Sequence, residues 1–403
     1  MKIKWLYCYL VLSIVLSIVL FSCKKTTESN VEWGNADFSS FVSIGNSLTA
    51  GMSDAALYED AQKTSFPNLI AKAVEIDNFQ QPLIGGNGYS LDEKKGRLSF
   101  TGTTIDYLSP GTEKNRNLNR AYNNLGIPSI TVKDAYSAKM PADAENNHFI
   151  DKILRNSGRT QIEEALSLSP TLITLWIGIN DVLKSASMGL ADYTDPAEFE
   201  SHFKNMMNEL TAGTDAPILV ANLLDLTDLP FFTGIPSSVN KGGNKVYYFG
   251  ECKNGVRRLT DDDHVLLPAT NEYINYVNSD NITQDNALND SLILDSEEKN
   301  EVQQILNEYN DIIGDIVNQN TQLHLVDIYT LFKNIELNGC QIGGIKYTKD
   351  VITFDENGIP NLNFVSLFSL DGLHPNQFGY TCIANTFIEK INSIFNTDIS
   401  IIN

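Results

Sequence analysis

Apolar residues occur along the chain in short continuous runs, and these alternate with longer segments in which apolar positions recur every three or four residues. Short continuous runs are typical of strands buried on both faces, whereas the second pattern predicts helices that pack by one side. The predicted strands are residues 41–45, 82–84, 130–132, 172–177, 217–224 and 323–328. The predicted helices are residues 66–74, 153–168, 198–210, 296–317 and 377–395. This alternation predicts an α/β fold with a mostly parallel sheet covered by helices.

Three segments fit the alternation poorly. Residues 85–124 are rich in Gly, Asn, Ser and Thr, and we expect them to cross the surface near the strand ends. Residues 225–295 contain many Gly and Pro residues together with aromatic groups, which are too many for a linker, so they form an insertion. This insertion is either a lid or substrate-facing wall, or an inert excursion. Residues 339–364, which hold an Asn-Gly pair between alternating runs, predict a hairpin.

The first 23 residues have the pattern of an export signal. Two lysines precede an apolar run over residues 5–21, and Ser22 and Cys23 follow. A single-pass anchor is the alternative, although the run is short for spanning about 30 Å of hydrocarbon. Residues 20–23 resemble the lipobox of bacterial lipoproteins, which implies that Cys23 carries lipid after cleavage. Residues 24–36 are then a polar tether, and residues 37–403 a single domain with its insertion at 225–295.

Charge and cysteine content exclude some classes of function. The chain has 403 residues, with 29 Lys+Arg against 50 Asp+Glu and a net charge of −21, which argues against nucleic-acid binding. No other long apolar run is present, which excludes a membrane-embedded protein beyond the first two dozen residues. Cys252, Cys340 and Cys382 remain after the signal, an odd number without CxxC spacing, so that only a Cys252–Cys340 pair stays open.

Ser47 is the candidate nucleophile. The apolar run at residues 41–44 ends in Gly45, Ser47 follows two residues later, and Gly51 lies just beyond, so the chain is predicted to turn sharply at the serine. A serine exposed on such a turn can attack a carbonyl if a base, an orienting acid and oxyanion donors are supplied from elsewhere in the chain.

Asp371 and His374 are the candidate acid and base. An aspartate three residues before a histidine on a turn can accept the Nδ1 proton of the ring and leave Nε2 free to accept a hydroxyl proton. The alternative is a capping turn with a bystander histidine. Asn180 follows the predicted strand at 172–177, at the sheet edge where α/β proteins bind ligands, and its amide could donate to an oxyanion. An Asx turn is the alternative there.

Together these segments resemble the GDSL lipase/acylhydrolases, also called SGNH hydrolases. The matching blocks are Gly-Asn-Ser-Leu at residues 45–48, Gly-Ile-Asn-Asp at 178–181 and Asp-Gly-Leu-His at 371–374, in the family's order, over about residues 41–395. The resemblance implies a three-layer α/β/α sandwich with a five-stranded, flavodoxin-like sheet. Asn46 stands where the family name has aspartate, and we expect the amide to support the turn in its place.

The resemblance also implies the oxyanion donors. They are the backbone N–H groups of Ser47 and of a glycine, together with the Asn180 side chain. Residues 124–128, Asn-Leu-Gly-Ile-Pro, are similar to the family block that supplies the glycine, which implies Gly126. Gly85, Gly86 and Gly88 lie in a comparable loop and stay open as alternatives.

The function implied is metal-free, cofactor-free hydrolysis of carboxylic esters, by a lipase-like enzyme or a glycan O-deacetylase. A lipid at Cys23 would hold it at the bacterial cell envelope, and Lys24 after the cysteine favours the outer membrane. The alternative is a non-catalytic glycan- or partner-binding lipoprotein on the same fold. Asp261–Asp263 with His264 could suggest a metal site, although a charged loop is the simpler interpretation, and Asp54 and Asp181 are read as solvated carboxylates or turn-builders.

Overall fold

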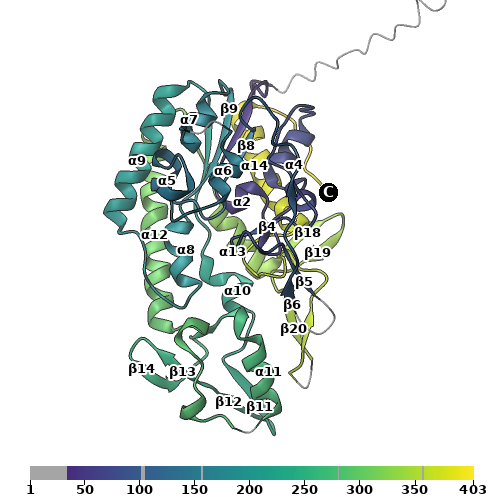
Figure 1. The fold of residues 1–403 in the computed structure, drawn as a ribbon, viewed down its shortest axis with the longest axis vertical. Helices are drawn as coiled ribbons and strands as arrows, with labels where there is room; N and C mark the ends of the chain where they lie inside the picture. Colours follow the sequence, from purple (N-terminus) through teal and green to yellow (C-terminus); the bar gives the residue numbers. More distant parts are fainter. Residues whose placement is uncertain (1–33, 101–104, 156–157, 280, 356–357) are drawn as a thin grey trace, which may run out of the picture.

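The computed structural model describes residues 34–403, apart from residues 101–104, 156–157, 280 and 356–357. At its centre lies a five-stranded sheet in the order β8-β1-β9-β10-β17, in which every neighbouring pair is parallel. The strands are β1 (Phe41–Gly45), β8 (Asn124–Gly126), β9 (Leu172–Trp176), β10 (Ile218–Ala221) and β17 (Leu323–Val326). The predicted α/β fold is confirmed (Figure 1).

Helices cover both faces of the sheet and give three layers (Figure 1). One face carries α5 (Val132–Ser137), α7 (Gln161–Leu166), α9 (Pro196–Gly213) and α12 (Ser296–Asn318), and the other carries α4 (Phe66–Ala73), α13 (Ile328–Asn338) and α14 (Gln377–Phe395). The Phe199 and Tyr309 rings of the first layer stack with centroids 3.8 Å apart, and Phe66 and Phe387 of the second stack at 4.7 Å. Because both faces are covered, β1, β9 and β10 are buried at every position, which explains their continuous apolar runs.

Some predicted elements differ from the structure. Residues 130–132 are not a strand, and the fifth strand of the sheet is β8 instead. The Asn-Leu-Gly sequence of β8 has no apolar pattern from which a strand could be predicted. Residues 82–84 contribute only to β3 (Ile84–Gly85), which pairs with β7 (Thr112–Glu113) outside the central sheet. The helix predicted over 153–168 is two helices, α6 (Phe149–Ile153) and α7, and α7 begins with a capping box between Thr160 and Glu163. Helix α13 was not predicted.

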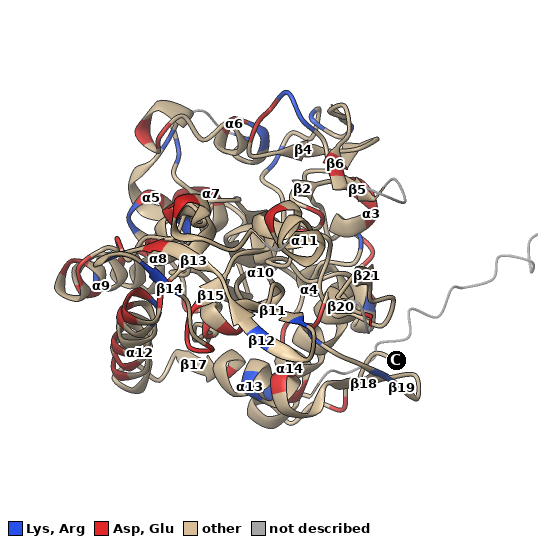
Figure 2. Ribbon diagram, turned by 90° about the horizontal axis from the view of Figure 1, so that it is seen from below, with Lys and Arg blue, Asp and Glu red and all other residues tan. Residues whose placement is uncertain are grey.

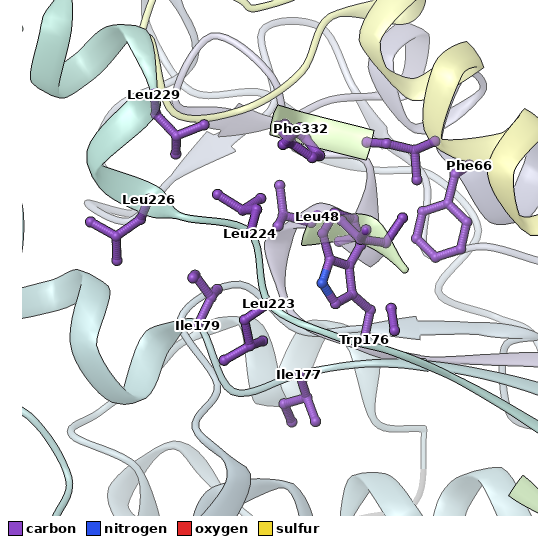
Figure 3. Close-up of a cluster of buried hydrophobic side chains, with 14 of the residues drawn as sticks. Leu48, Phe66, Trp176, Ile177, Ile179, Leu223, Leu224, Leu226, Leu229 and Phe332 are labelled. Atoms are coloured by element: carbon purple, nitrogen blue, oxygen red, sulfur yellow. The ribbon is translucent and has the colours of Figure 1, made fainter. Parts of the chain in front are cut away.

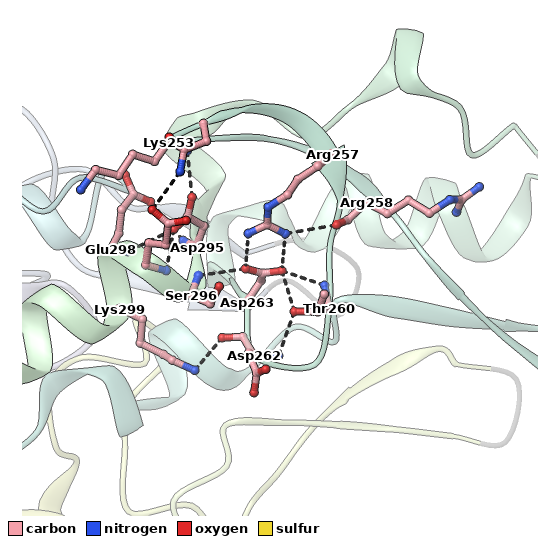
Figure 4. Close-up of polar contacts among 12 residues, drawn as sticks. Lys253, Arg257, Arg258, Thr260, Asp262, Asp263, Asp295, Ser296, Glu298 and Lys299 are labelled. Atoms are coloured by element: carbon pink, nitrogen blue, oxygen red, sulfur yellow. Dashed lines mark hydrogen bonds and ion pairs between the residues drawn. The ribbon is translucent and has the colours of Figure 1, made fainter.

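The insertion at residues 225–295 forms a lobe of short hairpins and helices at one end of the molecule, at the bottom of Figure 1. Its main elements are α10 (Pro230–Thr233), β11 (Ser238–Lys241), β12 (Asn244–Tyr247), β13 (Phe249–Cys252), β14 (Gly255–Arg258), β15 (His264–Val265), α11 (Thr270–Asn278) and β16 (Ile293–Leu294). Figure 4 shows how it joins α12: Asp263 forms a two-point ion pair with Arg257 and also accepts from the Ser296 N–H at 2.9 Å. The lobe is therefore fixed to the start of a core helix.

The predicted hairpin region forms two hairpins. The first is β18 (Cys340–Ile342) with β19 (Ile345–Tyr347), and the second is β20 (Ile352–Phe354) with β21 (Pro360–Leu362). A disulfide joins Cys340 to Cys382, so it ties the first hairpin to α14. The Cys252–Cys340 pairing was wrong, because Cys252 is a free, buried thiol whose pKa burial raises to about 12.

Acidic side chains are distributed over the surface, including the outer sides of α9 and α12 (Figure 2). Within the described residues, no helix combines the length and apolar character that crossing a membrane requires. The predicted signal segment at residues 1–23, the lipid-carrying Cys23 and most of the tether lie outside the described residues, so those statements remain predictions.

Candidate active site

Ser47 opens a one-turn helix, α2 (Ser47–Ala50), directly after β1. The Asn46 side chain caps this helix by accepting the Leu48 N–H at 2.9 Å, so it supports the turn. A Cβ on Gly45 would lie 2.3 Å from the Trp176 carbonyl oxygen, and for that reason the strand can end only in glycine here. Gly51 closes the helix in a left-handed conformation with φ of 82°. The serine is therefore held at the carboxyl edge of the sheet on a short, tightly packed turn.

A hydrogen-bonded chain links Ser47 to His374 and Asp371. The distance from His374 Nε2 to Ser47 Oγ is 3.0 Å, and that from His374 Nδ1 to Asp371 Oδ2 is 2.7 Å. Because the carboxylate accepts the Nδ1 proton, Nε2 is left as the acceptor for the serine proton. The three residues are 5%, 8% and 8% exposed, respectively, so that the chain is shielded from water on most sides. This arrangement can generate an oxygen nucleophile.

The Asp371 carboxylate is fixed by its own backbone surroundings. Its Oδ1 accepts the N–H groups of Leu373 at 2.9 Å and His374 at 2.8 Å, and its Oδ2 accepts the Ala55 N–H at 2.6 Å. Burial alone would raise its pKa, but the His374 ring and these hydrogen bonds outweigh burial and hold the pKa of Asp371 below its usual value. The acid therefore stays ionised beside the imidazole.

The insertion lobe supports this acid–base turn. Gly372 adopts a φ of +67°, and its carbonyl oxygen accepts the Phe231 N–H from α10 at 3.0 Å. A Cβ at Gly372 would lie 2.7 Å from that same nitrogen. The base of the lobe at residues 225–295 therefore contacts the acid–base turn, and its role as a lid or substrate-facing wall, or as an inert excursion, stays a prediction.

Asp54 provides a second carboxylate behind Asp371. It accepts the Tyr58 hydroxyl at 2.8 Å and the Leu370 N–H at 3.1 Å, and its own N–H donates to Ser369 Oγ. Burial raises the pKa of Asp54, with the nearby Asp371 charge adding to the effect. Asp54 does not contact the histidine, so it is a turn-builder, as one of the two sequence interpretations had it.

Asn180 lies at the start of α8 (Asn180–Ala186), after β9 and Gly178, whose φ is +118°. Its Nδ2 donates one hydrogen to the Ile130 carbonyl oxygen at 2.9 Å. That bond turns the amide toward the loop after β8 and leaves the second Nδ2 hydrogen for another acceptor. The Ser47 N–H, the first of a helix, has no intrahelical acceptor either. Both groups can serve as oxyanion donors. Leu48, Trp176 and Ile179 belong to a cluster of buried hydrophobic side chains (Figure 3).

Gly126 is the glycine that the family resemblance implies as an oxyanion donor. It is the last residue of β8, and its N–H donates to Asn124 Oδ1 at 3.0 Å, so this N–H already has an acceptor. A Cβ there would lie 2.2 Å from the Ala50 nitrogen of the nucleophile helix. The alternative glycines pack elsewhere: the equivalent atom on Gly85 would meet Lys114, and on Gly88 the Leu57 carbonyl.

A cavity of about 410 Å³ opens on the far side of the acid, where Asp54, Ser369 and Leu370 form part of its wall. The rest of its lining mixes polar and aromatic side chains and includes Arg97, Asn363, Gln377, Tyr58 and Phe364. Phe364, which follows the hairpin strand β21, is 89% exposed at its rim. Such a mixture can bind a polar ligand with flat or ring-shaped apolar faces.

The acidic loop at residues 261–264 is engaged in ordinary contacts. Asp261 pairs with Lys245 and Tyr247, Asp263 pairs with Arg257, and burial lowers the pKa of His264 to about 4. Across the described ranges, no group of three or more His, Cys, Asp or Glu side chains is arranged to hold a metal ion.

The sequence motifs did not identify the residues that hold the site in place by backbone or supporting hydrogen bonds. Ala55 and Ser369 donate to Asp371, but neither belongs to a motif with a recognisable chemical role. Asn124 and Asn147 hold the loop after β8, by hydrogen bonds to Gly126 and Pro128. An Asn-rich stretch beside a strand end was their only signal, and that signal is common in turns.

Three solved structures that align with this chain are of a carbohydrate esterase, a lipase and a phospholipase. Clostridium thermocellum family 3 carbohydrate esterase aligns with 14% identity and a TM-score of 0.34, covering 88% of this chain and 96% of that one. The extracellular lipase from Streptomyces rimosus aligns with 10% identity and a TM-score of 0.36, over 87% and 98%. Phospholipase A1 from Streptomyces albidoflavus NA297 aligns with 11% identity and a TM-score of 0.34, over 87% and 98%.

The family assignment rests on a different comparison. No curated protein matches the chain. The family model described as GDSL-like Lipase/Acylhydrolase matches residues 41–387, which include Ser47, Asn180 and His374. That range covers most of the chain and starts and ends within the sheet-and-helix core. The protein is therefore a serine ester hydrolase that belongs to the GDSL-like lipase/acylhydrolase family.

Proposed function

We propose that the protein hydrolyses carboxylic esters with Ser47 as nucleophile, His374 as general base and acid, and Asp371 as the residue that orients the ring. The observation that carries this proposal is the continuous hydrogen-bonded chain from Ser47 Oγ through the imidazole to Asp371. The order of the sequence motifs and the short distances between these three residues support the proposed roles.

In the proposed reaction, Ser47 Oγ bonds to the ester carbonyl carbon while its proton passes to His374 Nε2. The carbonyl oxygen becomes an oxyanion that accepts hydrogen bonds from the Ser47 N–H and Asn180 Nδ2. The imidazolium, stabilised by the Asp371 carboxylate, then gives its proton to the departing alcohol, and the C–O ester bond breaks. Water attacks the acyl-serine with the same proton transfers and releases the acid.

As the substrate class we propose an acylated glycan, ahead of an acyl lipid. The support is the cavity on the far side of Asp371, whose polar lining and aromatic rim suit a sugar ring better than a long alkyl chain. Its lining does not include Ser47, His374 or Asn180, so this cavity would hold a sugar of the glycan away from the reacting ester. We further propose a lipid-anchored location at the bacterial envelope through Cys23, on the outer membrane in preference to the inner one. The Cys340–Cys382 disulfide supports export, because such bonds persist in oxidising compartments.

The nucleophile is tested with purified protein beginning after Cys23 and a short-chain p-nitrophenyl ester. Ser47→Ala is expected to lower kcat by about 10⁴-fold or more, because the covalent step is removed. Labelling by a fluorophosphonate should be lost in Ser47→Ala and His374→Ala. Labelling that persists without His374 would contradict the histidine as base, and equal esterase activity in the parent and Ser47→Ala would contradict Ser47 as nucleophile. A parent protein that is neither labelled nor active on any ester would favour the non-catalytic binding alternative.

Substrate and location need separate measurements. A panel of acetylated xylan and esters of graded acyl length compares kcat/KM, and faster turnover of long-chain lipid esters would overturn the glycan proposal. For location, full-length protein and Cys23→Ser are compared in membrane and soluble fractions of the expressing bacterium. Equal partition of the two proteins would contradict the lipid anchor.

A further inference from the structure

Three basic residues, Lys94, Lys95 and Arg97, lie close together in a chain whose net charge is −21, and the proposed mechanism uses none of them. Lys94 and Lys95 are exposed, whereas Arg97 is partly buried and lines the cavity of about 410 Å³ on the far side of Asp371. No other lysine or arginine is among the described residues that line this cavity. Arg97 is therefore the positive charge that a ligand in the cavity would meet.

The Arg97 guanidinium is held in a fixed position without a carboxylate partner. It lies over the Tyr58 ring, with 4.9 Å from Cζ to the ring centroid, and the Tyr58 hydroxyl donates to Asp54 Oδ2 at 2.8 Å. The other oxygen of that carboxylate accepts the Leu370 N–H at 3.1 Å. Among the described residues, no acidic side chain forms an ion pair with Arg97, and its Nε is buried without an acceptor. Because the planar guanidinium matches the geometry of a carboxylate, Arg97 suits a ligand that brings its own carboxylate.

The rest of the cavity suits a sugar ring. The exposed Phe364 and the partly buried Phe378 offer aromatic faces, and the side chains of Asn363 and Gln377 add amide groups for hydroxyls. Asp60 also lines the cavity, but it is exposed, so that salt and water screen its charge. A ligand with one carboxylate on a sugar ring therefore fits this lining.

One hairpin carries residues of both the cavity and the catalytic edge. Arg97 directly precedes β5 (Leu98–Phe100), which pairs with β6 (Ile105–Tyr107), and its carbonyl oxygen accepts the Leu108 N–H at 2.9 Å. Burial, together with the nearby Asp371 charge, raises the pKa of Tyr107, so the Tyr107 phenol is within electrostatic reach of the proposed catalytic acid. A glycan that lies along this hairpin would extend from Arg97 toward that acid.

The charge of the whole chain limits what the glycan can be. A protein with a net charge of −21 repels a polymer in which every sugar is charged. A neutral glycan with isolated uronate groups avoids most of this repulsion and still brings one carboxylate to Arg97. Because Ser47 does not line the cavity, the uronate and the reacting ester belong to different sugar units.

We propose that the cavity on the far side of Asp371 binds a hexuronate side group, with Arg97 holding its carboxylate and Phe364 packing on its ring. The substrate is then a neutral polysaccharide that carries both O-acyl groups and isolated uronate branches. This choice of substrate rests on the proposed ester hydrolysis, whereas the uronate site does not depend on it. Arg97 is a specificity-determining residue and takes no part in the chemistry at Ser47.

The deciding measurement is calorimetric binding of two oligosaccharides without acyl groups to the full-length protein in detergent. One is xylotetraose with a single glucuronate branch, and the other is unbranched xylotetraose. The branched ligand should bind about 10- to 100-fold more tightly, because a two-point contact between arginine and carboxylate is a strong hydrogen-bonded pair. Equal dissociation constants would overturn the proposal, and so would tighter binding of trigalacturonate, in which every sugar is charged. Inorganic phosphate that competes as well as free glucuronate would mean a general anion site and would overturn the assignment to a uronate.

Three variants locate the carboxylate contact. Arg97→Gln should bind the two oligosaccharides equally, and Arg97→Lys, which keeps the charge but loses the planar fork, should retain only part of the preference. Lys94→Gln is the matched control, since it removes the same charge from the same basic run outside the cavity, and it should keep the full preference. A preference that survives in Arg97→Gln, or is lost in Lys94→Gln, would contradict the proposal. If thermal melting shows that Arg97→Gln does not fold, the comparison of Arg97→Lys with the parent decides.

The same protein preparation separates this site from the proposed hydrolysis. A parent protein that prefers the branched ligand but cleaves no ester would refute the hydrolysis and leave the uronate site in place. A parent protein that cleaves p-nitrophenyl esters but binds both oligosaccharides equally would overturn the uronate site alone.

Discussion

Two turns flank Ser47, and they are built in opposite ways. The acid–base turn at residues 371–374 is held largely from within, since the Asp371 carboxylate accepts two backbone N–H groups of its own turn as well as the ring of His374. The N–H groups of Ala55 and Phe231 add contacts from outside. The turn at residues 127–130 is held from outside, by side-chain amides of Asn147 and Asn180 on its carbonyl oxygens. The first turn carries the proposed acid and base, whereas the second fixes the loop that follows β8.

This difference decides what can be recognised in the sequence. A turn that works through side chains needs particular residues at particular spacings, so Asp371 and His374 stand out as a motif. The turn at residues 127–130 depends on a backbone conformation, in which Ser129 has a φ of +60° at some cost in strain, and no residue pattern in the sequence predicts that conformation. Gly126 is conspicuous in the sequence, and the close contact of β8 with α2 explains why this position is glycine.

The largest effect expected from this comparison comes from removing the charge of the acid. Asp371→Asn should lower kcat by about 10⁴-fold, because the amide can hold the wrong tautomer of His374 and cannot stabilise the imidazolium. The measurement is kcat/KM on a p-nitrophenyl ester. The matched control is Asp54→Asn, which alters the neighbouring carboxylate that does not touch the ring, and it should lose less than about tenfold. Similar losses in both variants would mean that the two carboxylates act as a unit.

The central sheet was predictable for the same reason as the acid–base turn. Strands β1, β9 and β10 are buried on both faces, and burial forces a continuous apolar run that can be read directly. Strand β8 was missed because it lies at the edge of the sheet and has no apolar pattern. Its asparagine serves hydrogen bonding and its glycine serves close packing, in place of apolar burial. The disulfide was missed because its partners are 42 residues apart and no spacing rule connects β18 to α14.

A smaller effect, on stability, tests the close packing of Gly126 in β8 against α2. Gly126→Ala should lower the free energy of unfolding by about 1–3 kcal/mol, because the new Cβ would overlap the Ala50 backbone, which cannot move aside cheaply. The change is measured by urea denaturation. Gly314→Ala is the matched control, since Gly314 lies in α12 with open space around its Cβ position, and it should gain up to about 1 kcal/mol from helix propensity. A stable Gly126→Ala protein would show that β8 and α2 can separate.

The smallest expected effect concerns Asp181, which holds the far end of the externally supported turn. Its carboxylate accepts the Val132 N–H at 3.1 Å, just beyond Ile130, and burial raises the pKa of Asp181 to about 7. Between pH 4 and pH 7 the folded protein then binds more protons at this site than the unfolded chain, so the contribution of Asp181 to stability is present at low pH and is lost as the pH rises through about 7. Asp181→Asn keeps an oxygen acceptor for Val132 and removes the titration. The free energy of unfolding of Asp181→Asn minus that of the parent should therefore be larger at pH 8 than at pH 5, by on the order of 1–2 kcal/mol. If this difference in the free energy of unfolding does not change with pH, then burying the Asp181 charge does not destabilise the folded protein.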